Sequence, residues 1–321
     1  MQDPAVRFTA VETVELTSQP PPAPGPGQVC VRLSCSAISP GTELATLRGK
    51  AMALPITPGY SAAGVVEALG PDVEGLTPGQ RVAVHAPHAA RATVRREHCH
   101  ALPEHLPLPH AALYRLGSIS LQGVRKAQLQ LGERVAVVGL GPIGQLAADL
   151  AWLNGAGQVV GIDPQAWRGE LALAGHTTRH VARAEDLPPE SFDVVIEATG
   201  LPEVIPAALE LARSRGRAVL LGSPRGTTAH FDFYRLVHRK GLTLVGAHDA
   251  TRSVHDNLGP WRTGAFDGDT IINLMADGRL NVERLISDET PGLDAPTAYQ
   301  RLLAGDEPLM TIVLRWDPPG T

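Results

Sequence analysis

Residues 134–144 read RVAVVGLGPIG, and after an apolar stretch the chain reaches VVGID at 159–163. A valine-rich strand, a Gly-x-Gly-x-x-Gly turn and a helix are predicted in that order, which is the arrangement that binds a dinucleotide. The helix is expected to begin at Pro142 and Ile143, because a proline in the first helical turn lacks only an N–H that would have no partner there. The helix N-terminus would then face the phosphates of the ligand with N–H groups and a positive dipole end.

Each glycine of this turn has its own task. Gly139 allows the turn, Gly141 lets a pyrophosphate approach the backbone, and Gly144 lets the helix pack closely on the strand. Asp163 follows Gly144 by 19 residues, near the spacing of about 20 at which a carboxylate hydrogen-bonds the adenosine ribose. That carboxylate would repel a 2′-phosphate, so NAD(H) is favoured over NADP(H), although Arg168 could soften the preference.

Composition and charge narrow the function classes. The 321 residues suffice for two domains of ordinary size, and the formal net charge of −5 argues against nucleic acid and favours a small-molecule partner. No apolar run approaches the roughly 18 residues that span a membrane, so a cytoplasmic protein without membrane binding is expected. Cys30, Cys35 and Cys99 form no Cys-x-x-Cys pair, so structural zinc is not expected.

Strand and helix patterns alternate after residue 163. With the two strands above they predict about six strands with crossover helices, the size of a full dinucleotide-binding sheet. Strands are expected at 179–181, 193–197, 217–222 and 242–245, and a helix at 202–213. Ligands of such sheets bind beyond the carboxyl ends of the strands, which places the cofactor over Thr199, Gly200, Gly222, Ser223, Gly246 and His248.

The first 115 or so residues have short alternating apolar runs between Pro and Gly, a texture that predicts a β-rich domain. After residue 248 the pattern indicates one further helix at 270–276 and a terminal strand at 311–314.

This order of parts resembles the medium-chain dehydrogenase/reductase family, which is zinc-type alcohol dehydrogenase-like. Besides the glycine turn, the resemblance rests on PGYSAAGVV at 58–66, GQRVAV at 79–84, EATG at 197–200 and RKGLTLVG at 239–246. It implies an α/β protein with a GroES-like β-rich catalytic domain at 1–116, a Rossmann doubly wound parallel sheet at 117–251, and a return to the catalytic domain at 252–321. It also implies a homodimer, joined through the edge of the nucleotide-binding sheet.

The departures from the family pattern concern zinc. Ser39 stands where the family has a ligand cysteine, Tyr60 replaces the ligand histidine, and residues 114–116 read YRL near the usual ligand glutamate. Zinc prefers thiolate, imidazole and carboxylate to a hydroxyl or a phenol, so no zinc is expected. The histidines at 85, 88, 98 and 100 could be drawn as a replacement site, but strand alternation would send His98 and His100 to one face and leave two ligands where three are needed.

Without a metal, hydroxyl groups have to stabilise the substrate oxygen and move its proton. Thr42 matches the family residue that starts the proton relay, and Ser39 and Tyr60 are expected to point toward the same space. Glu43 matches the acidic residue that follows this threonine and is usually structural. Alternatively, Tyr60 only fills the vacated metal pocket and Ser39 only caps a turn; His85, His88 and His248 are outside candidates.

The Ser-x-Gly-Thr-Glu stretch at 39–43 is similar to a zinc-free branch that includes bacteriochlorophyllide dehydrogenases. The leading hypothesis is therefore an NAD(H)-dependent oxidoreductase that exchanges hydride with a secondary alcohol or ketone. A quinone or enone reductase that uses NADPH is the second hypothesis. A cofactor-binding redox sensor without turnover is the third, since fold alone does not exclude it.

Overall fold

The computed structural model describes residues 3–18, 20–253, 257 and 259–317. Contacts divide the chain into two compact units, one formed by Met1–Arg115 with Gly268–Thr321 and the other by Leu116–Asp267. The helices α3 (Tyr114–Lys126) and α7 (Gly264–Ala276) each contain one point at which the chain passes from one unit to the other.

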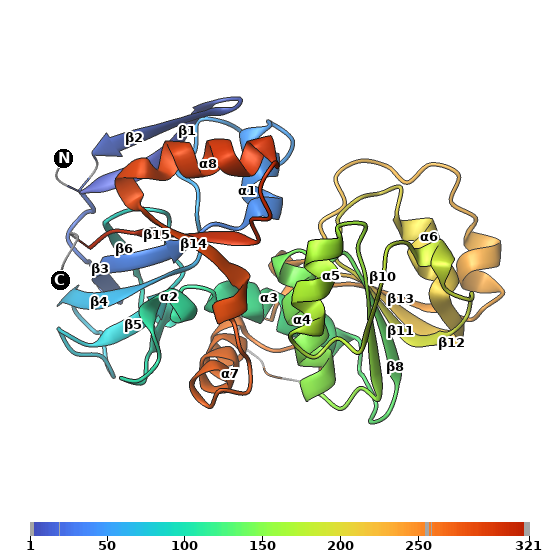
Figure 1. Cartoon of the computed structure of the whole chain (residues 1–321). Helices are drawn as coiled ribbons and strands as arrows, with labels where there is room; N and C mark the ends of the chain where they lie inside the picture. The colour runs from blue at the N-terminus through green and yellow to red at the C-terminus, as the bar shows by residue number, and fades with distance from the viewer. Residues whose placement is uncertain (1–2, 19, 254–256, 258, 318–321) are drawn as a thin grey trace. The chain divides into compact units, whose positions relative to one another are not determined.

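The first unit is built around a seven-stranded sheet, in which β14, β15, β3, β4, β5 and β7 follow one another and β6 also pairs with β3. A two-stranded sheet of β1 and β2, the helices α1 and α8 and the short helix α2 complete the unit (Figure 1). The bounds are β1 Pro4–Ala10, β2 Thr13–Ser18, β3 Gln28–Ala37, α1 Pro40–Leu47, β4 Ala62–Leu69, β5 Arg81–Val84, β6 Arg91–Arg95, β7 Cys99–Ala101, α2 Leu108–Ala111, β14 Ile286–Pro291, α8 Ala295–Ala304 and β15 Thr311–Arg315. This unit is the expected β-rich domain.

A buried apolar cluster beneath α1 and α8 holds the predicted catalytic segment in place. It contains Phe8, Ile38, Leu47 and Tyr299, none of which exposes surface. The rings of Phe8 and Tyr299 meet edge to face, with their centroids 5.0 Å apart. Because Ile38 lies just before α1 and Leu47 is its last residue, burial of both fixes the residues between them.

The second unit contains the predicted doubly wound sheet. Its six parallel strands follow the order β10, β9, β8, β11, β12, β13, which is the strand order of a dinucleotide-binding fold. In Figure 1, α4 and α5 cover one face and α6 covers the other. The bounds are β8 Arg134–Val138, α4 Pro142–Leu153, β9 Gln158–Ile162, α5 Ala166–Leu173, β10 Arg179–Val181, β11 Phe192–Glu197, α6 Ile205–Leu211, β12 Ala212–Leu220 and β13 Thr243–Gly246.

Some predicted bounds were wrong. The helix expected at 202–213 is only α6, because Ala212 pairs with Phe192 of β11 and starts β12 instead of continuing the helix. The helix expected at 270–276 begins six residues earlier, at Gly264. In both places a local apolar pattern gave the type of element but not its ends.

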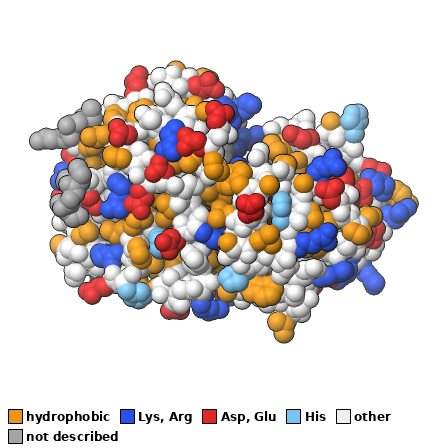
Figure 2. Space-filling view, in the orientation of Figure 1, with side chains coloured by type: hydrophobic (Ala, Val, Ile, Leu, Met, Phe, Trp, Pro, Cys, Tyr) orange, Lys and Arg blue, Asp and Glu red, His pale blue; other side chains and the backbone are white. Residues whose placement is uncertain are grey.

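Charges of both signs are interspersed on the face of the molecule that Figure 2 shows. This agrees with the small net charge of the chain. Among the described residues, no helix combines the length and the apolar character that a membrane crossing requires.

Candidate active site

Three of the predicted catalytic residues belong to α1 and its N-cap. Ser39 is the N-cap residue, but its hydroxyl makes no capping hydrogen bond. The Ser39 hydroxyl is therefore not engaged in capping the helix. Its backbone N–H instead donates to Oε1 of Glu43 at 2.8 Å, and the Glu43 N–H donates back to the Ser39 carbonyl at 3.0 Å. These two reciprocal bonds fix Ser39 against the first turn of the helix.

Tyr60 reaches this turn from the loop before β4. Its phenol donates a hydrogen bond to Ser39 Oγ at 2.5 Å. Burial raises the pKa of Tyr60 to about 12, although hydrogen bonds with Ser39 and Thr42 act in the opposite direction. The structure thus brings Ser39, Thr42 and Tyr60 together, and the phenol remains a proton donor at neutral pH.

Beneath these hydroxyls lies a buried carboxylate. Glu43 is 2 % exposed, and its Oε2 accepts a hydrogen bond from the phenol of Tyr299, which comes from α8. Burial, and next the charge of Glu43, raise the pKa of Tyr299 well above its ordinary value, so this phenol also stays protonated. With the Ser39 N–H on its other oxygen, Glu43 has protein donors on both sides.

His88 completes this buried cluster. Its Nε2 lies 2.9 Å from Glu43 Oε2, its Nδ1 lies 2.7 Å from Ser36 Oγ, and the Trp316 indole donates to the same Ser36 oxygen at 2.9 Å. A neutral His88 that donates from Nε2 and accepts at Nδ1 satisfies every partner. Gly59, with φ of +96°, leaves space for His88, since a Cβ at Gly59 would lie 2.6 Å from the backbone nitrogen of His88 and 2.7 Å from its ring.

One of the other histidines, His98, does not lie on the strand where the prediction placed it. His98 ends a 3₁₀ turn at Arg96–His98, and β7 begins only at Cys99, so the predicted strand alternation of His98 and His100 was wrong. The ring of His85 lies 6.5 Å from that of Tyr60 and 5.2 Å from that of His98. Burial lowers the pKa of His98, which favours its neutral form.

The donor set does not fit zinc. The two positions that hold metal ligands in the family carry the hydroxyl of Ser39 and the protonated phenol of Tyr60, which are poor zinc ligands. The cysteines lie elsewhere, and burial raises the pKa of Cys35 and Cys99 to about 12. Within the described ranges, no group of three or more His, Cys, Asp or Glu could hold a metal ion.

The glycine turn of the second unit has the geometry that a dinucleotide requires. Gly139 has φ of +91°, and a Cβ there would lie 2.9 Å from the Thr199 nitrogen. A Cβ at Gly144 would overlap the Gly139 carbonyl, whereas the Cβ position at Gly141 is open. α4 starts with Pro142 after its N-cap Gly141, as predicted. The open position and the helix N-terminus fit a pyrophosphate.

Asp163 directly follows β9 and is 4 % exposed. Its carboxylate accepts hydrogen bonds from the backbone N–H groups of Leu140 and Gln165, both at 2.9 Å. Arg168 Nη1 lies 3.4 Å from Oδ2. Because a carboxylate offers about four acceptor positions, at least one remains for a ribose hydroxyl. The ion pair with Arg168 partly offsets the charge that would repel a 2′-phosphate.

The turns after β11 and β12 lie against each other. A Cβ at Gly222 would overlap the Gly200 nitrogen, and a Cβ at Gly200 would lie 2.9 Å from the Ser223 carbonyl oxygen. Both glycines are thus required by close backbone contact, and the structure brings together Thr199, Gly200, Gly222 and Ser223. The fifth predicted position, Gly246 at the end of β13, pairs with Leu220 of β12.

Glu197 opens the EATG stretch at 197–200, but it was not predicted to belong to the site. Its Oε1 accepts hydrogen bonds from the Thr199 N–H at 2.6 Å, from the Thr199 hydroxyl and from the Gly200 N–H at 3.2 Å. Burial raises the pKa of this carboxyl group. Among the described residues its Oε2 has no hydrogen-bond partner. Glu197 therefore shapes the turn that carries two predicted cofactor contacts.

His88 and Tyr299 were also missed as partners of Glu43. Tyr299 is 256 positions away along the chain, and no local pattern links the two. His88 was considered only as an outside candidate, since a single histidine has no period that predicts burial. The sequence did contain a signal for Glu197, because a carboxylate at the end of an apolar strand is unusual and indicates a specific role.

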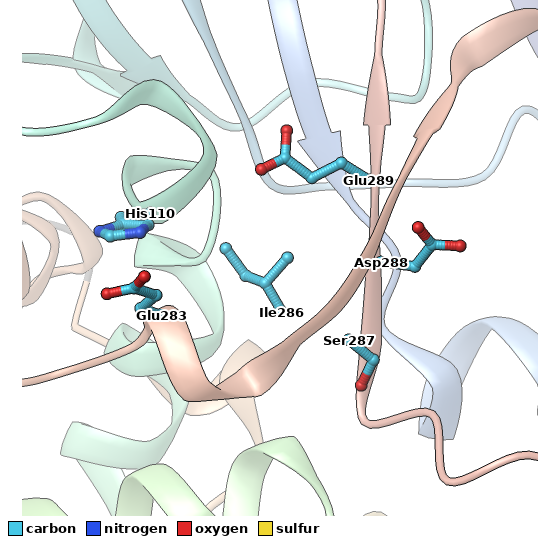
Figure 3. Close-up of a pocket in the computed structure, with 6 residues that line it drawn as sticks. All are labelled: His110, Glu283, Ile286, Ser287, Asp288 and Glu289. Atoms are coloured by element: carbon cyan, nitrogen blue, oxygen red, sulfur yellow. The ribbon is translucent and has the colours of Figure 1, made fainter.

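Two open pockets of about 290 and 240 Å³ lie on the first unit and involve other residues. The first is lined by His110, Glu283, Ser287 and their neighbours along β14 (Figure 3). Neither pocket is lined by the predicted catalytic residues. The acidic groups there are partly engaged, since Asp288 pairs with Arg301 and Glu289 with Arg315.

Comparison with known proteins agrees with both units. Residues 25–120 match the family described as the alcohol dehydrogenase GroES-like domain, and residues 142–257 match the one described as zinc-binding dehydrogenase. Together the two matches cover well over half of the chain.

Relatives match along nearly the full length. The chain is 26 % identical to a 2-dehydro-3-deoxy-L-galactonate 5-dehydrogenase of Pseudoalteromonas atlantica, over 91 % of this chain and 92 % of that protein. It is also 26 % identical to a sorbitol dehydrogenase of Gallus gallus, over 95 % and 94 %. Galactitol-1-phosphate dehydrogenase of Escherichia coli has the same fold, with a TM-score of 0.85, 21 % identity and coverage of 97 % and 99 %. The chain therefore belongs to the medium-chain, zinc-type alcohol dehydrogenase-like family and is an oxidoreductase of that family.

Proposed function

We propose that this oxidoreductase exchanges hydride between NAD(H) and a secondary alcohol or ketone without catalytic zinc. The observation that carries the proposal is the hydrogen-bonded cluster of Ser39, Thr42 and Tyr60 at the positions where related enzymes hold the metal and start the proton relay. The named relatives include dehydrogenases of a sugar acid and of sorbitol, which favours a hydroxylated small molecule as the substrate.

The cluster can do the proton chemistry of this reaction. Because Tyr60 donates to Ser39 Oγ, the Ser39 hydroxyl keeps its own proton for a substrate oxygen. In ketone reduction, Ser39 would give that proton to the developing alkoxide while Tyr60 gives its proton to Ser39, and the phenol would regain a proton from Thr42 and ultimately from solvent. Alcohol oxidation would run the same transfers in reverse.

The second unit supports a nicotinamide dinucleotide as the hydride carrier. The family uses NAD(P), and when bound its nicotinamide ring accepts or donates the hydride. The turn at Gly139–Gly144 would receive the pyrophosphate beside Gly141, and Asp163 would bind the adenosine ribose. The buried carboxylate favours NAD(H), and its ion pair with Arg168 limits the preference.

The two alternative functions, an enone or quinone reductase and a redox sensor, would give different experimental results. A quinone or enone reductase would prefer NADPH and would reduce conjugated double bonds. A redox sensor would bind the cofactor but turn over no alcohol, ketone, enone or quinone. A homodimer and a cytoplasmic location are also part of the proposal.

The experiment is a fluorescence titration of the purified protein with NADH and with NADPH, with zinc measured on the same sample, followed by a panel of secondary alcohols and ketones. The proposal predicts tighter binding of NADH, no stoichiometric zinc, and turnover of at least one substrate class. Preference for NADPH with enone turnover would favour the reductase. Cofactor binding without any turnover would favour the sensor.

A further inference from the structure

The segment that follows β13 is tied to α3 at both ends. Gln122 of α3, which is 3 % exposed, donates from Nε2 to the Ala247 carbonyl at 3.0 Å. Four residues further along the helix, the Lys126 ammonium donates to Thr251 Oγ1 at 2.8 Å and to Gln122 Oε1 at 3.0 Å. Gln122 thus holds the start of the segment and Lys126 holds its end.

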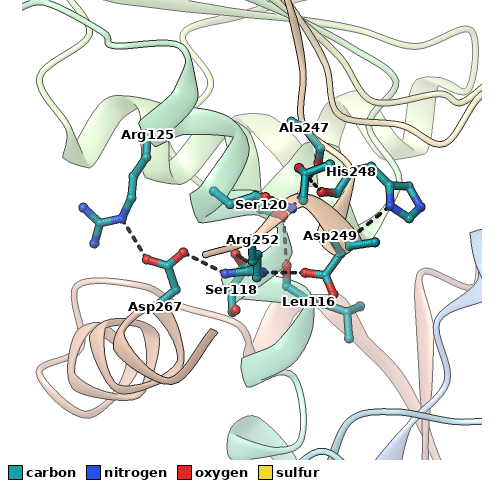
Figure 4. Close-up of polar contacts among 12 residues, drawn as sticks. Leu116, Ser118, Ser120, Arg125, Ala247, His248, Asp249, Arg252 and Asp267 are labelled. Atoms are coloured by element: carbon teal, nitrogen blue, oxygen red, sulfur yellow. Dashed lines mark hydrogen bonds and ion pairs between the residues drawn. The ribbon is translucent and has the colours of Figure 1, made fainter. Parts of the chain in front are cut away.

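Arg252 fixes the same segment by charge (Figure 4). Its guanidinium pairs with Asp249 at 2.5 Å and with Asp267 at 2.8 Å, and it donates to the Ser118 carbonyl of α3 at 2.6 Å. The second oxygen of Asp267 accepts from Arg125 Nε at 2.8 Å. Asp267 is fully buried, and a buried carboxylate between two guanidinium groups imposes one geometry on all of its partners.

These contacts set the backbone just beyond the carboxyl end of β13. The Ala247 N–H donates to the Leu220 carbonyl at 3.0 Å, and the Ala247 carbonyl accepts the hydrogen bond from Gln122. His248 follows, and its carbonyl accepts from the Thr251 N–H and hydroxyl within the turn. The position of this turn is therefore determined by side chains of α3 and by Arg252, and not only by the strand that precedes it.

We propose that Gln122 and Arg252 are positioning residues for the nicotinamide half of the cofactor. The inference rests on the proposed function. With the adenosine ribose at Asp163, the nicotinamide half of the cofactor would lie over the other strand ends, which include Gly246 and His248. Gln145, on α4, holds backbone at the adenosine end of the site. Its Nε2 donates to the Leu140 carbonyl at 3.3 Å and to the Arg168 carbonyl at 2.8 Å. The two buried glutamines therefore allow the two halves of the site to be tested separately.

The test compares the affinities of NADH and ADP-ribose, a probe that lacks the nicotinamide, by calorimetry on the full-length protein. Gln122→Met removes the donor to Ala247 and is expected to weaken NADH about tenfold, while ADP-ribose binding changes less than about twofold. The matched control Gln145→Met is expected to weaken both ligands to a similar extent. Arg252→Lys, which keeps the charge but loses the planar fork, is expected to behave as Gln122→Met does.

Gln122→Glu provides a second variant if Gln122→Met does not fold, because it keeps the shape and the contact with Lys126 but removes the N–H donor. Equal loss of NADH and ADP-ribose in the Gln122 variants, or no loss of either, would overturn the inference while leaving the proposed function intact. Failure of the unmodified protein to bind both ligands would overturn the cofactor assignment itself.

Discussion

Tyr60 combines a short hydrogen bond to Ser39 with a half-buried phenol whose pKa is raised to about 12, and this keeps it a donor throughout the working range of pH. Tyr60→Phe keeps the ring that fills the site but removes the proton. Turnover of the substrate is expected to fall about a hundredfold or more, with the affinity for NADH unchanged. Steady-state kinetics with a parallel NADH titration measure both quantities. Unchanged turnover would mean that Tyr60 only fills space.

The raised pKa of Tyr60 has a defined consequence for pH dependence. Its value of about 12 lies above the ordinary value of 10.0, so the phenol contributes stability that is present below pH 10 and is lost as the pH rises through 12. The activity profile should show no ionisation of Tyr60 between about pH 6 and 10. An ultraviolet titration of phenolate in the unmodified protein and in Tyr60→Phe checks this. A titration near pH 8 that disappears in the variant would contradict it.

Asp163 is expected to set the preference between the two dinucleotides. Asp163→Asn keeps the shape and an acceptor for the Leu140 or Gln165 N–H but removes the charge that would repel a 2′-phosphate. The ratio of the NADPH dissociation constant to the NADH dissociation constant should fall about tenfold. The repelling charge is gone, and Arg168 no longer pairs with a carboxylate, so its charge can attract the 2′-phosphate. Fluorescence titration measures the ratio, and an unchanged ratio would refute the role of this carboxylate.

The turn between β8 and α4 contains a matched pair of glycines. Gly144→Ala would place a methyl group on the Gly139 carbonyl, which should lower the free energy of unfolding by about 1–3 kcal/mol or more. Gly141→Ala meets open space, so stability should change by less than about 0.5 kcal/mol, while NADH binds more weakly. Thermal unfolding and NADH titration test both variants. Equal destabilisation would contradict the separate tasks of the two glycines.

Much of the second unit could be predicted from the sequence, because apolar strands at regular intervals and a glycine turn are local signals. β8, β9 and the start of α4 were placed almost to the residue. The helices α1, α3 and α8 were not predicted, although α1 carries Thr42 and Glu43. Its eight residues start with Pro-Gly and have a weak apolar period, so tertiary burial of Ile38 and Leu47 decides the structure there.

The same distinction holds within the candidate site. The contact between Ser39 and Tyr60 followed from the family positions that both residues occupy. The support from His88, Tyr299 and Trp316 could not be predicted, since these residues come from distant parts of the chain and meet Glu43 and Ser36 only in the folded unit. Hydrogen bonds between such side chains leave no periodic trace in a sequence.

At the scale of the whole molecule, the exposed edge of the parallel sheet is the feature that bears on assembly into a dimer. β13 is an edge strand, and Leu244 on it is partly exposed. An edge strand offers unpaired backbone groups to a second copy, and a lysine on the edge opposes such pairing. Light scattering is expected to give the mass of a dimer for the unmodified protein and of a monomer for Leu244→Lys. A monomer in both cases, or a dimer in both, would contradict assembly through this edge.

The measurement that bears most directly on the proposed chemistry is the oxidation of secondary alcohols with NAD⁺ by protein whose zinc content is measured before and after treatment with a chelator. The hydroxyl cluster of Ser39, Thr42 and Tyr60 predicts turnover without stoichiometric zinc, unchanged by the chelator and lost in Tyr60→Phe. Turnover that requires stoichiometric zinc and disappears on chelation would contradict the account.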